Sequence, residues 1–70
     1  MTGHHPTTAL RGLGETITRH RVSHGLTQQQ LAGAVGVSRQ TIARVETGHS
    51  VASETLTEIA AVLGLHVTLE

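Results

Sequence analysis

Three times between residues 27 and 64, a residue that can cap the start of a helix is followed by a glycine that can end one. The pairs are Thr27 with Gly36, Ser38 with Gly48, and Ser53 with Gly64. A hydroxyl oxygen at the N-cap accepts a hydrogen bond from a free backbone N–H of the first turn, and glycine readily takes the left-handed conformation that closes a helix. The sequence therefore predicts three short helices, which must form a core by packing together.

The first of these three helices has the strongest start signal. Gln30 stands where its side chain can reach back to the capping residue, which completes a capping box. Leu26 and Leu31 form a hydrophobic staple across this start, and Val37 and Ile42 repeat the staple across the next one. We therefore expect one short helix that Gly36 ends and a second that runs to about Glu46 and closes at Gly48.

A further helix is expected to precede them, because apolar residues recur at helical spacing from about Thr8 until Gly25 ends the pattern. Gly12 and Gly14 lie within it, and each weakens a helix by up to about 1 kcal/mol relative to alanine. We therefore predict a flexible N-terminal arm over residues 1–7, a helical domain over residues 8–64, and a separate tail over residues 65–70.

In the tail, the spacing of the apolar residues changes from that of a helix to that of a strand. Leu65, Val67 and Leu69 alternate with polar residues, which is the two-residue repeat of a β-strand. A single strand after a helical domain has no partner in its own chain, so antiparallel pairing with a second copy would satisfy its backbone and make a homodimer. The alternative is that the tail is frayed or folds back on the last helix as coil.

Composition limits the remaining classes of protein. The chain has 70 residues and contains no Phe, Tyr, Trp or Cys, so its core must be aliphatic and has no disulfide to support it. The apolar runs are too short to span a membrane, and the N-terminus lacks the order of a signal peptide. We expect a soluble cytoplasmic protein.

Charge is distributed unevenly along the chain. Five arginines and one glutamate lie in residues 1–45, whereas residues 46–70 hold four glutamates and no Arg or Lys.

The expected third helix has one face suited to DNA. Arg39, Gln40, Ala43 and Arg44 fall within an arc of roughly 140°, opposite Ile42 and Val45. A small residue at the centre of the arc lets the backbone approach a flat surface. Arg pairs with the O6 and N7 of guanine, and Gln pairs with the N6 and N7 of adenine. A solvated polar face would explain the charged residues but not the central alanine.

The segment "LTQQQLAGAVGVSRQTIARVETG", from Leu26 to Gly48, carries a more specific pattern. Counted from Gln28, Ala32 lies four residues on, Gly36 eight and Ile42 fourteen. This pattern resembles the Xre-like helix-turn-helix family of the phage repressor and Cro type. The resemblance implies an all-α fold, a compact four- to five-helix lambda-repressor-like domain, to which the tail adds a short C-terminal β-strand used in dimerisation.

The resemblance also implies residue roles. Bases would be read by Arg39, Gln40, Thr41 and Arg44, and phosphates would be bound by Gln28, Thr27, Ser38, Thr47, His49 and Ser50. Arg21 and Glu46 match a structural ion pair, and the dimerising tail residues are Leu65, Val67 and Leu69. The implied partner is double-stranded DNA, and the implied function is a transcriptional regulator, a homodimeric repressor on a palindromic operator.

Two other functions stay open at this point. A C-terminal strand of this kind resembles dimeric antitoxins of toxin–antitoxin operons, so the chain could bind a toxin or another protein, with DNA binding secondary. The six histidines raise metal binding, since His20 and His24 share a helix face. Two ligands do not make a closed site, so we expect no metal and no cofactor. We also expect no enzyme activity, because no nucleophile and base stand in a recognisable motif.

Overall fold

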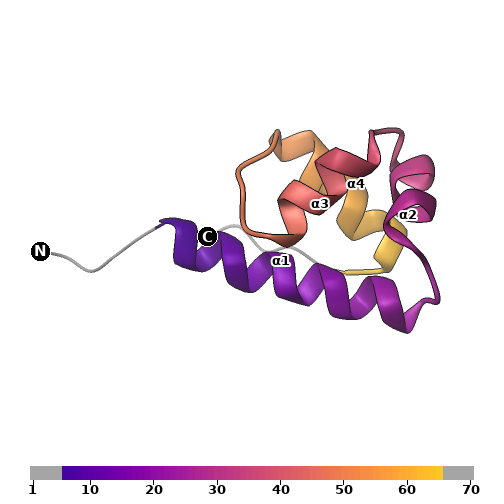
Figure 1. The fold of residues 1–70 in the computed structure, drawn as a ribbon, viewed down its shortest axis with the longest axis horizontal. Helices are drawn as coiled ribbons and strands as arrows, with labels where there is room; N and C mark the ends of the chain where they lie inside the picture. Colours follow the sequence, from indigo (N-terminus) through magenta and orange to yellow (C-terminus); the bar gives the residue numbers. More distant parts are fainter. Residues whose placement is uncertain (1–5, 66–70) are drawn as a thin grey trace, which may run out of the picture.

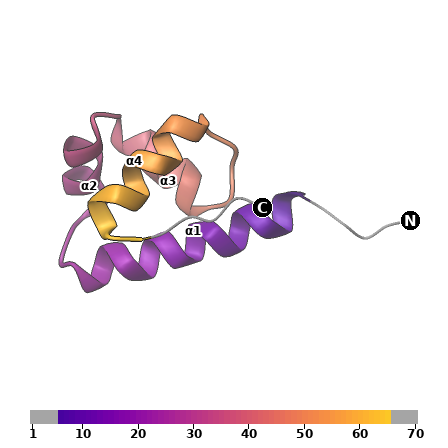
Figure 2. The ribbon, with the colours of Figure 1, turned by 180° about the vertical axis from the view of Figure 1, so that it is seen from behind.

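The computed structural model describes residues 6–65, with side chains described from residue 11 onward. It contains four helices, which are α1 (Pro6–Ser23), α2 (Gln28–Val35), α3 (Arg39–Glu46) and α4 (Ser53–Leu63). The long α1 lies along one side, and the three shorter helices pack together above it (Figure 1). Figure 2, seen from behind, shows α4 in front of α3. The predicted all-α fold is confirmed, and residues 6–65 contain no strand.

The predicted strand mostly lies outside the described residues. Val67 and Leu69 are not described, and Leu65, which is, follows α4 without regular secondary structure. The α1 helix begins at Pro6, two residues before the expected start at Thr8. Within residues 6–65, no helix is both long enough and apolar enough to cross a membrane.

The starts of α2 and α3 confirm the capping predictions. Thr27 Oγ1 accepts a hydrogen bond from the Gln30 backbone N–H at 3.0 Å, and the Thr27 N–H donates to Gln30 Oε1 at 2.9 Å. Ser38 Oγ accepts from the Thr41 backbone N–H at 3.1 Å. Between the two helices, Gly36 takes φ = 89°, a left-handed conformation that side chains disfavour, so the tight turn requires glycine.

The predicted cap of α4 is wrong. Ala52, not Ser53, occupies the N-cap position, because its carbonyl already accepts from the N–H groups of Thr55 (3.0 Å) and Leu56 (3.2 Å). Ser53 is the first helical residue, and its carbonyl accepts from Thr57 Oγ1 at 3.1 Å. Ser53 therefore lies inside the helix and not at its N-cap position. The other end matches the prediction, since Gly64 closes α4 at φ = 70°.

Every helix contributes to one aliphatic core. The buried residues are Ile17 from α1, Leu31 and Ala32 from α2, Ile42 and Val45 from α3, and Ile59, Ala60 and Leu63 from α4. Burying one Leu or Ile side chain stabilises a fold by about 1.5–3 kcal/mol, so this small set provides most of the driving force. The staple residues Leu26 and Val37 pack against the edge of the same core.

Gly14 sets how closely α1 and α3 approach. It is buried, and a Cβ atom placed on it would lie 2.5 Å from the Val45 carbonyl oxygen and 2.7 Å from that of Glu46. Real Cβ atoms do not come so near backbone oxygens, so only glycine allows this crossing. Gly12 differs, because a Cβ there would meet no described atom within 4 Å. The two glycines look equivalent in sequence and have different roles in the fold.

Candidate nucleic-acid interface

The two faces of α3 separate as the sequence predicts. Ile42 and Val45 are buried in the core, with 0% and 3% of their surface exposed. Arg39, Gln40 and Arg44 are exposed on the other side. Ala43 is half-buried, so its small side chain leaves the backbone of α3 accessible among long polar groups. This face offers two guanidinium groups and one amide on an eight-residue helix.

Thr41 differs from the other three predicted base-reading residues. It is half-buried, and its hydroxyl lies 3.0 Å from the hydroxyl of Ser38. Its backbone N–H also donates to Ser38, as described above. Thr41 is thus engaged with the helix cap, and its side chain is less available to a ligand than that of Arg39.

The Arg39 side chain is held by α2. Arg39 Nη1 donates to Gln28 Oε1 at 3.2 Å, and Gln28 Nε2 donates to Glu46 Oε1 at 3.0 Å. An ionised carboxylate only accepts hydrogen bonds, so it fixes the Gln28 amide with its nitrogen toward Glu46 and its oxygen toward Arg39. Sequence reasoning missed this internal role of Gln28, because its two partners lie 11 and 18 positions further along the chain.

The predicted ion pair between Arg21 and Glu46 is present. Arg21 Nε donates to Glu46 Oε2 at 2.6 Å, and Arg21 Nη2 donates to Oε1 at 3.2 Å. The third guanidinium nitrogen, Nη1, donates to the Leu26 carbonyl at 2.8 Å. This arginine therefore joins α1 to the end of α3 and to the loop before α2.

Glu46 is the centre of this network. Burial raises the pKa of its carboxyl, but the hydrogen bonds from Arg21, Gln28 and Thr18, together with the positive charge of Arg21, outweigh burial and hold the pKa below its ordinary value. Glu46 is therefore ionised at neutral pH and is an acceptor for Arg21 and Gln28. Directional hydrogen bonds thus link α1, α2 and both ends of α3.

The loop after α3 presents polar side chains to solvent. Thr47, His49 and Ser50 are all exposed. Thr47 Oγ1 donates to the Ala43 carbonyl at 3.0 Å and lies 3.1 Å from His49 Nδ1. The His49 ring is thus placed beside Thr47, at the exposed end of this loop. The predicted phosphate-binding residues thus lie in two groups. The loop after α3 carries one group, and Thr27, Gln28 and Ser38, at the starts of α2 and α3, form the second.

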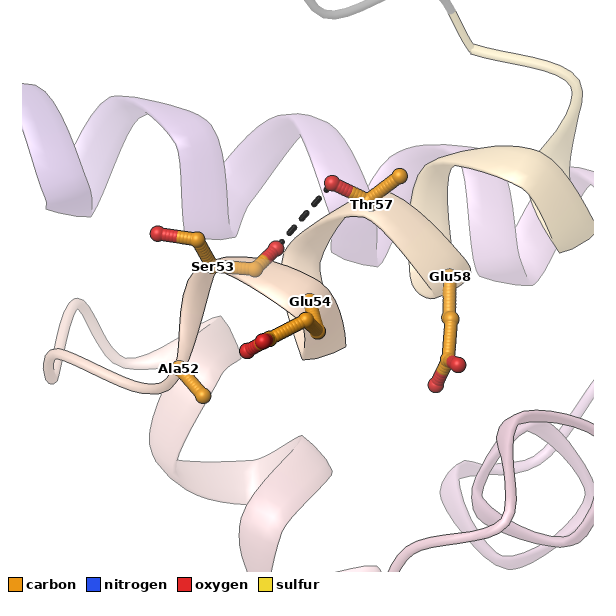
Figure 3. Close-up of a pocket in the computed structure, with 5 residues that line it drawn as sticks. All are labelled: Ala52, Ser53, Glu54, Thr57 and Glu58. Carbon is orange, nitrogen blue, oxygen red and sulfur yellow. Dashed lines mark hydrogen bonds between the residues drawn. The ribbon is translucent and has the colours of Figure 1, made fainter.

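The other polar features lie apart from these groups. A shallow depression on α4 is lined by Ala52, Ser53, Glu54, Thr57 and Glu58, none of which is a predicted site residue (Figure 3). Its two carboxylates would repel DNA phosphates. Just after the end of α1, the ring Nδ1 of His24 lies 2.8 Å from the carbonyl oxygen of His20. Within the described part of the chain, no three His, Cys, Asp or Glu side chains gather where they could hold a metal ion.

Comparison with known proteins adds one finding. Residues 17–69, more than half of the chain, match a sequence model described as helix-turn-helix. The match includes α2, the turn at Gly36 and α3, and it begins within α1 at Ile17. No curated protein matches the chain significantly.

Proposed function

The chain belongs to the helix-turn-helix family, whose members are DNA-binding transcription regulators, and we propose that it is a sequence-specific repressor that binds a palindromic operator as a homodimer. One observation supports base reading most strongly. Arg39, Gln40 and Arg44 are exposed together on one face of α3, while the opposite face is locked into the core.

Arg39 and Gln40 lie in the first turn of α3, and in this class of motif the N-terminal residues of the second helix contact base edges in the major groove. The guanidinium groups suit guanine and the Gln40 amide suits adenine. The hydrogen bond from Arg39 to Gln28 limits the rotamers of the arginine, so less entropy is lost when it pairs with a base. We assign Thr41 a supporting contact with the base edges, beside those of Arg39 and Gln40.

Phosphate contacts would fix the position of α3 in the groove. We assign them to Thr27, Gln28 and Ser38 on one side and to Thr47, His49 and Ser50 on the other. Gln28 Nε2 has two hydrogens, and Glu46 accepts one of them, so the second remains for a phosphate oxygen. A phosphate contact at Gln28 is therefore compatible with its internal hydrogen bonds.

A homodimer would present two copies of α3 to the DNA, and so would read more base pairs than one copy. One helix of eight residues reads few base pairs, whereas two copies related by a two-fold axis would enter successive major grooves about 34 Å apart. We propose that the tail residues Leu65, Val67 and Leu69 form the contact between copies. Truncation after Gly64 should then convert a dimer into a monomer, measured by light scattering; an unchanged mass would contradict this part of the proposal.

The test of the function is a selection of bound duplexes from a random DNA pool, at low salt and then near physiological salt. A palindromic consensus that survives the higher salt is expected, and its half-site spacing would give the dimer geometry. Binding that disappears with salt and yields no consensus would contradict base reading, since phosphate attraction alone behaves in this way. A protein partner, such as a toxin, would then become the better candidate.

A further inference from the structure

The N-terminal part of α1 extends beyond the family match. Residues 6–16 of this helix precede the matched segment, which begins at Ile17. In both views α3 ends close to α1, and the chain that follows α3 starts beside this helix before it runs up and away to the start of α4 (Figures 1 and 2). The extension therefore lies next to the loop of residues 47–50, which carries proposed phosphate-binding residues.

Gly48 fixes this contact. It is buried at φ = +91°, and a Cβ atom placed on it would lie 3.1 Å from the Arg11 Cα and 3.3 Å from the Arg11 nitrogen. The two backbones are thus packed directly against each other, with no side chain between them. Arg11 consequently has a defined position relative to Thr47, His49 and Ser50, although it is far from them in sequence.

The Arg11 side chain is exposed to solvent. Within residues 11–65 it makes no hydrogen bond or ion pair, and the single ion pair there joins Arg21 to Glu46. Two other arginines also have partners, since Arg19 donates to Thr16 at 3.2 Å and Arg39 donates to Gln28. Glu15, one turn further along α1, is exposed and not paired with Arg11.

We propose that Arg11 binds a backbone phosphate of duplex DNA together with the exposed side chains of residues 47–50. The loop follows the C-terminal end of α3, so a strand that borders the groove occupied by α3 passes this end of the domain. A guanidinium fork pairs with a phosphate through two parallel hydrogen bonds, and Ser50 and His49 can add further donors. This inference rests on the proposed DNA-binding function and adds a contact outside the matched segment.

The experiment compares Arg11→Gln with Arg19→Gln, which removes the same charge from the same helix. Affinity is measured by fluorescence anisotropy over a range of salt concentrations, on the selected operator and on a random duplex. Arg11→Gln should weaken binding roughly tenfold on both duplexes and reduce the salt slope by about one. Arg19→Gln should change the affinity less than twofold. Arg11→Lys should recover the salt slope, since it restores the charge.

Three results would overturn the assignment. Equal effects of Arg11→Gln and Arg19→Gln would show only a general loss of charge, and a loss confined to the operator would make Arg11 a base-reading residue. With either of these two results, the proposed function still stands as long as the wild-type protein selects an operator. Only the Arg11 contact is then wrong. A wild-type protein that binds no duplex overturns both. Circular dichroism confirms that each variant is folded before its affinity is compared.

Discussion

The surroundings of α3 and the start of α4 are built differently. Around α3, directional polar contacts are dense, because Ser38 caps the helix and Glu46 accepts from Arg21 and Gln28. At the start of α4, Ala52 has no side-chain group that could cap the helix. The helix is instead held by buried apolar residues, which are Ile59, Ala60 and Leu63.

The difference has a functional reason in our proposal. Apolar burial does not depend on direction, so it attaches α4 without fixing side-chain rotamers at its surface. Base reading needs donors held in a defined geometry, and hydrogen bonds supply that geometry around Arg39. The polar network thus specifies where α3 points, and α4 completes the core beneath it.

The largest expected effect comes from the crossing of α1 and α3. Gly14→Ala would place a methyl group against two backbone oxygens, which cannot move as a side chain can. The free energy of unfolding should fall by about 3 kcal/mol, the upper end of the penalty for overpacking. Gly12→Ala is the matched control, and it should raise stability by up to about 1 kcal/mol through helix propensity. Urea denaturation measures both, and equal effects would contradict the close crossing.

A smaller effect concerns the pH dependence of stability. The pKa of Glu46 is lowered from its ordinary value of 4.5, so the ionised carboxylate stabilises the folded state above that pH. This stabilisation is lost as the pH falls through the lowered pKa. Glu46→Gln should remove about 2 kcal/mol at pH 7 and show a weaker loss of stability in acid than the wild type.

The matched control for this comparison is Glu58→Gln, which removes an exposed carboxylate from α4. It should change stability by less than about 0.5 kcal/mol and keep the acid dependence of the wild type. Thermal unfolding followed from pH 7 to pH 3 distinguishes the variants. If Glu46→Gln kept the full acid dependence, the network would not be its source.

The smallest effect tests the helix starts directly. Thr27→Ala removes the cap of α2 and should lower the free energy of unfolding by about 1 kcal/mol. Ala52→Ser gives α4 a cap and should raise stability by up to about the same amount. Both substitutions are at exposed positions, so packing changes little. A loss from Ala52→Ser would mean that the start of α4 cannot accommodate a side-chain cap.

The sequence predicts the features that depend on neighbours along the chain. The caps at Thr27 and Ser38, the turn at Gly36 and the two faces of α3 all follow from spacings of a few residues. The error at Ser53 is of the same local kind, because a hydroxyl residue one position inside a helix looks identical to a cap in the sequence.

Features that depend on contacts between distant parts of the chain could not be predicted from residue spacing. From the sequence, Gly14 is expected only to weaken α1, and the crossing with α3 is what shows why a side chain is excluded there. The positions of Arg11 beside Gly48 and of Gln28 beside Arg39 likewise join distant parts of the chain. Helical periodicity predicts which face of each helix is buried, but it does not predict how closely two helices approach. The ion pair of Arg21 with Glu46 was predictable only through family resemblance.

Base reading by α3 is tested most directly by repeating the duplex selection with Arg39→Ala beside the wild-type protein. Our proposal predicts that the half-site spacing is kept and that preference is relaxed at one base pair of each half-site, where the arginine would pair. An unchanged consensus at every position would show that Arg39 does not read a base, and would contradict the assignment of this face of α3.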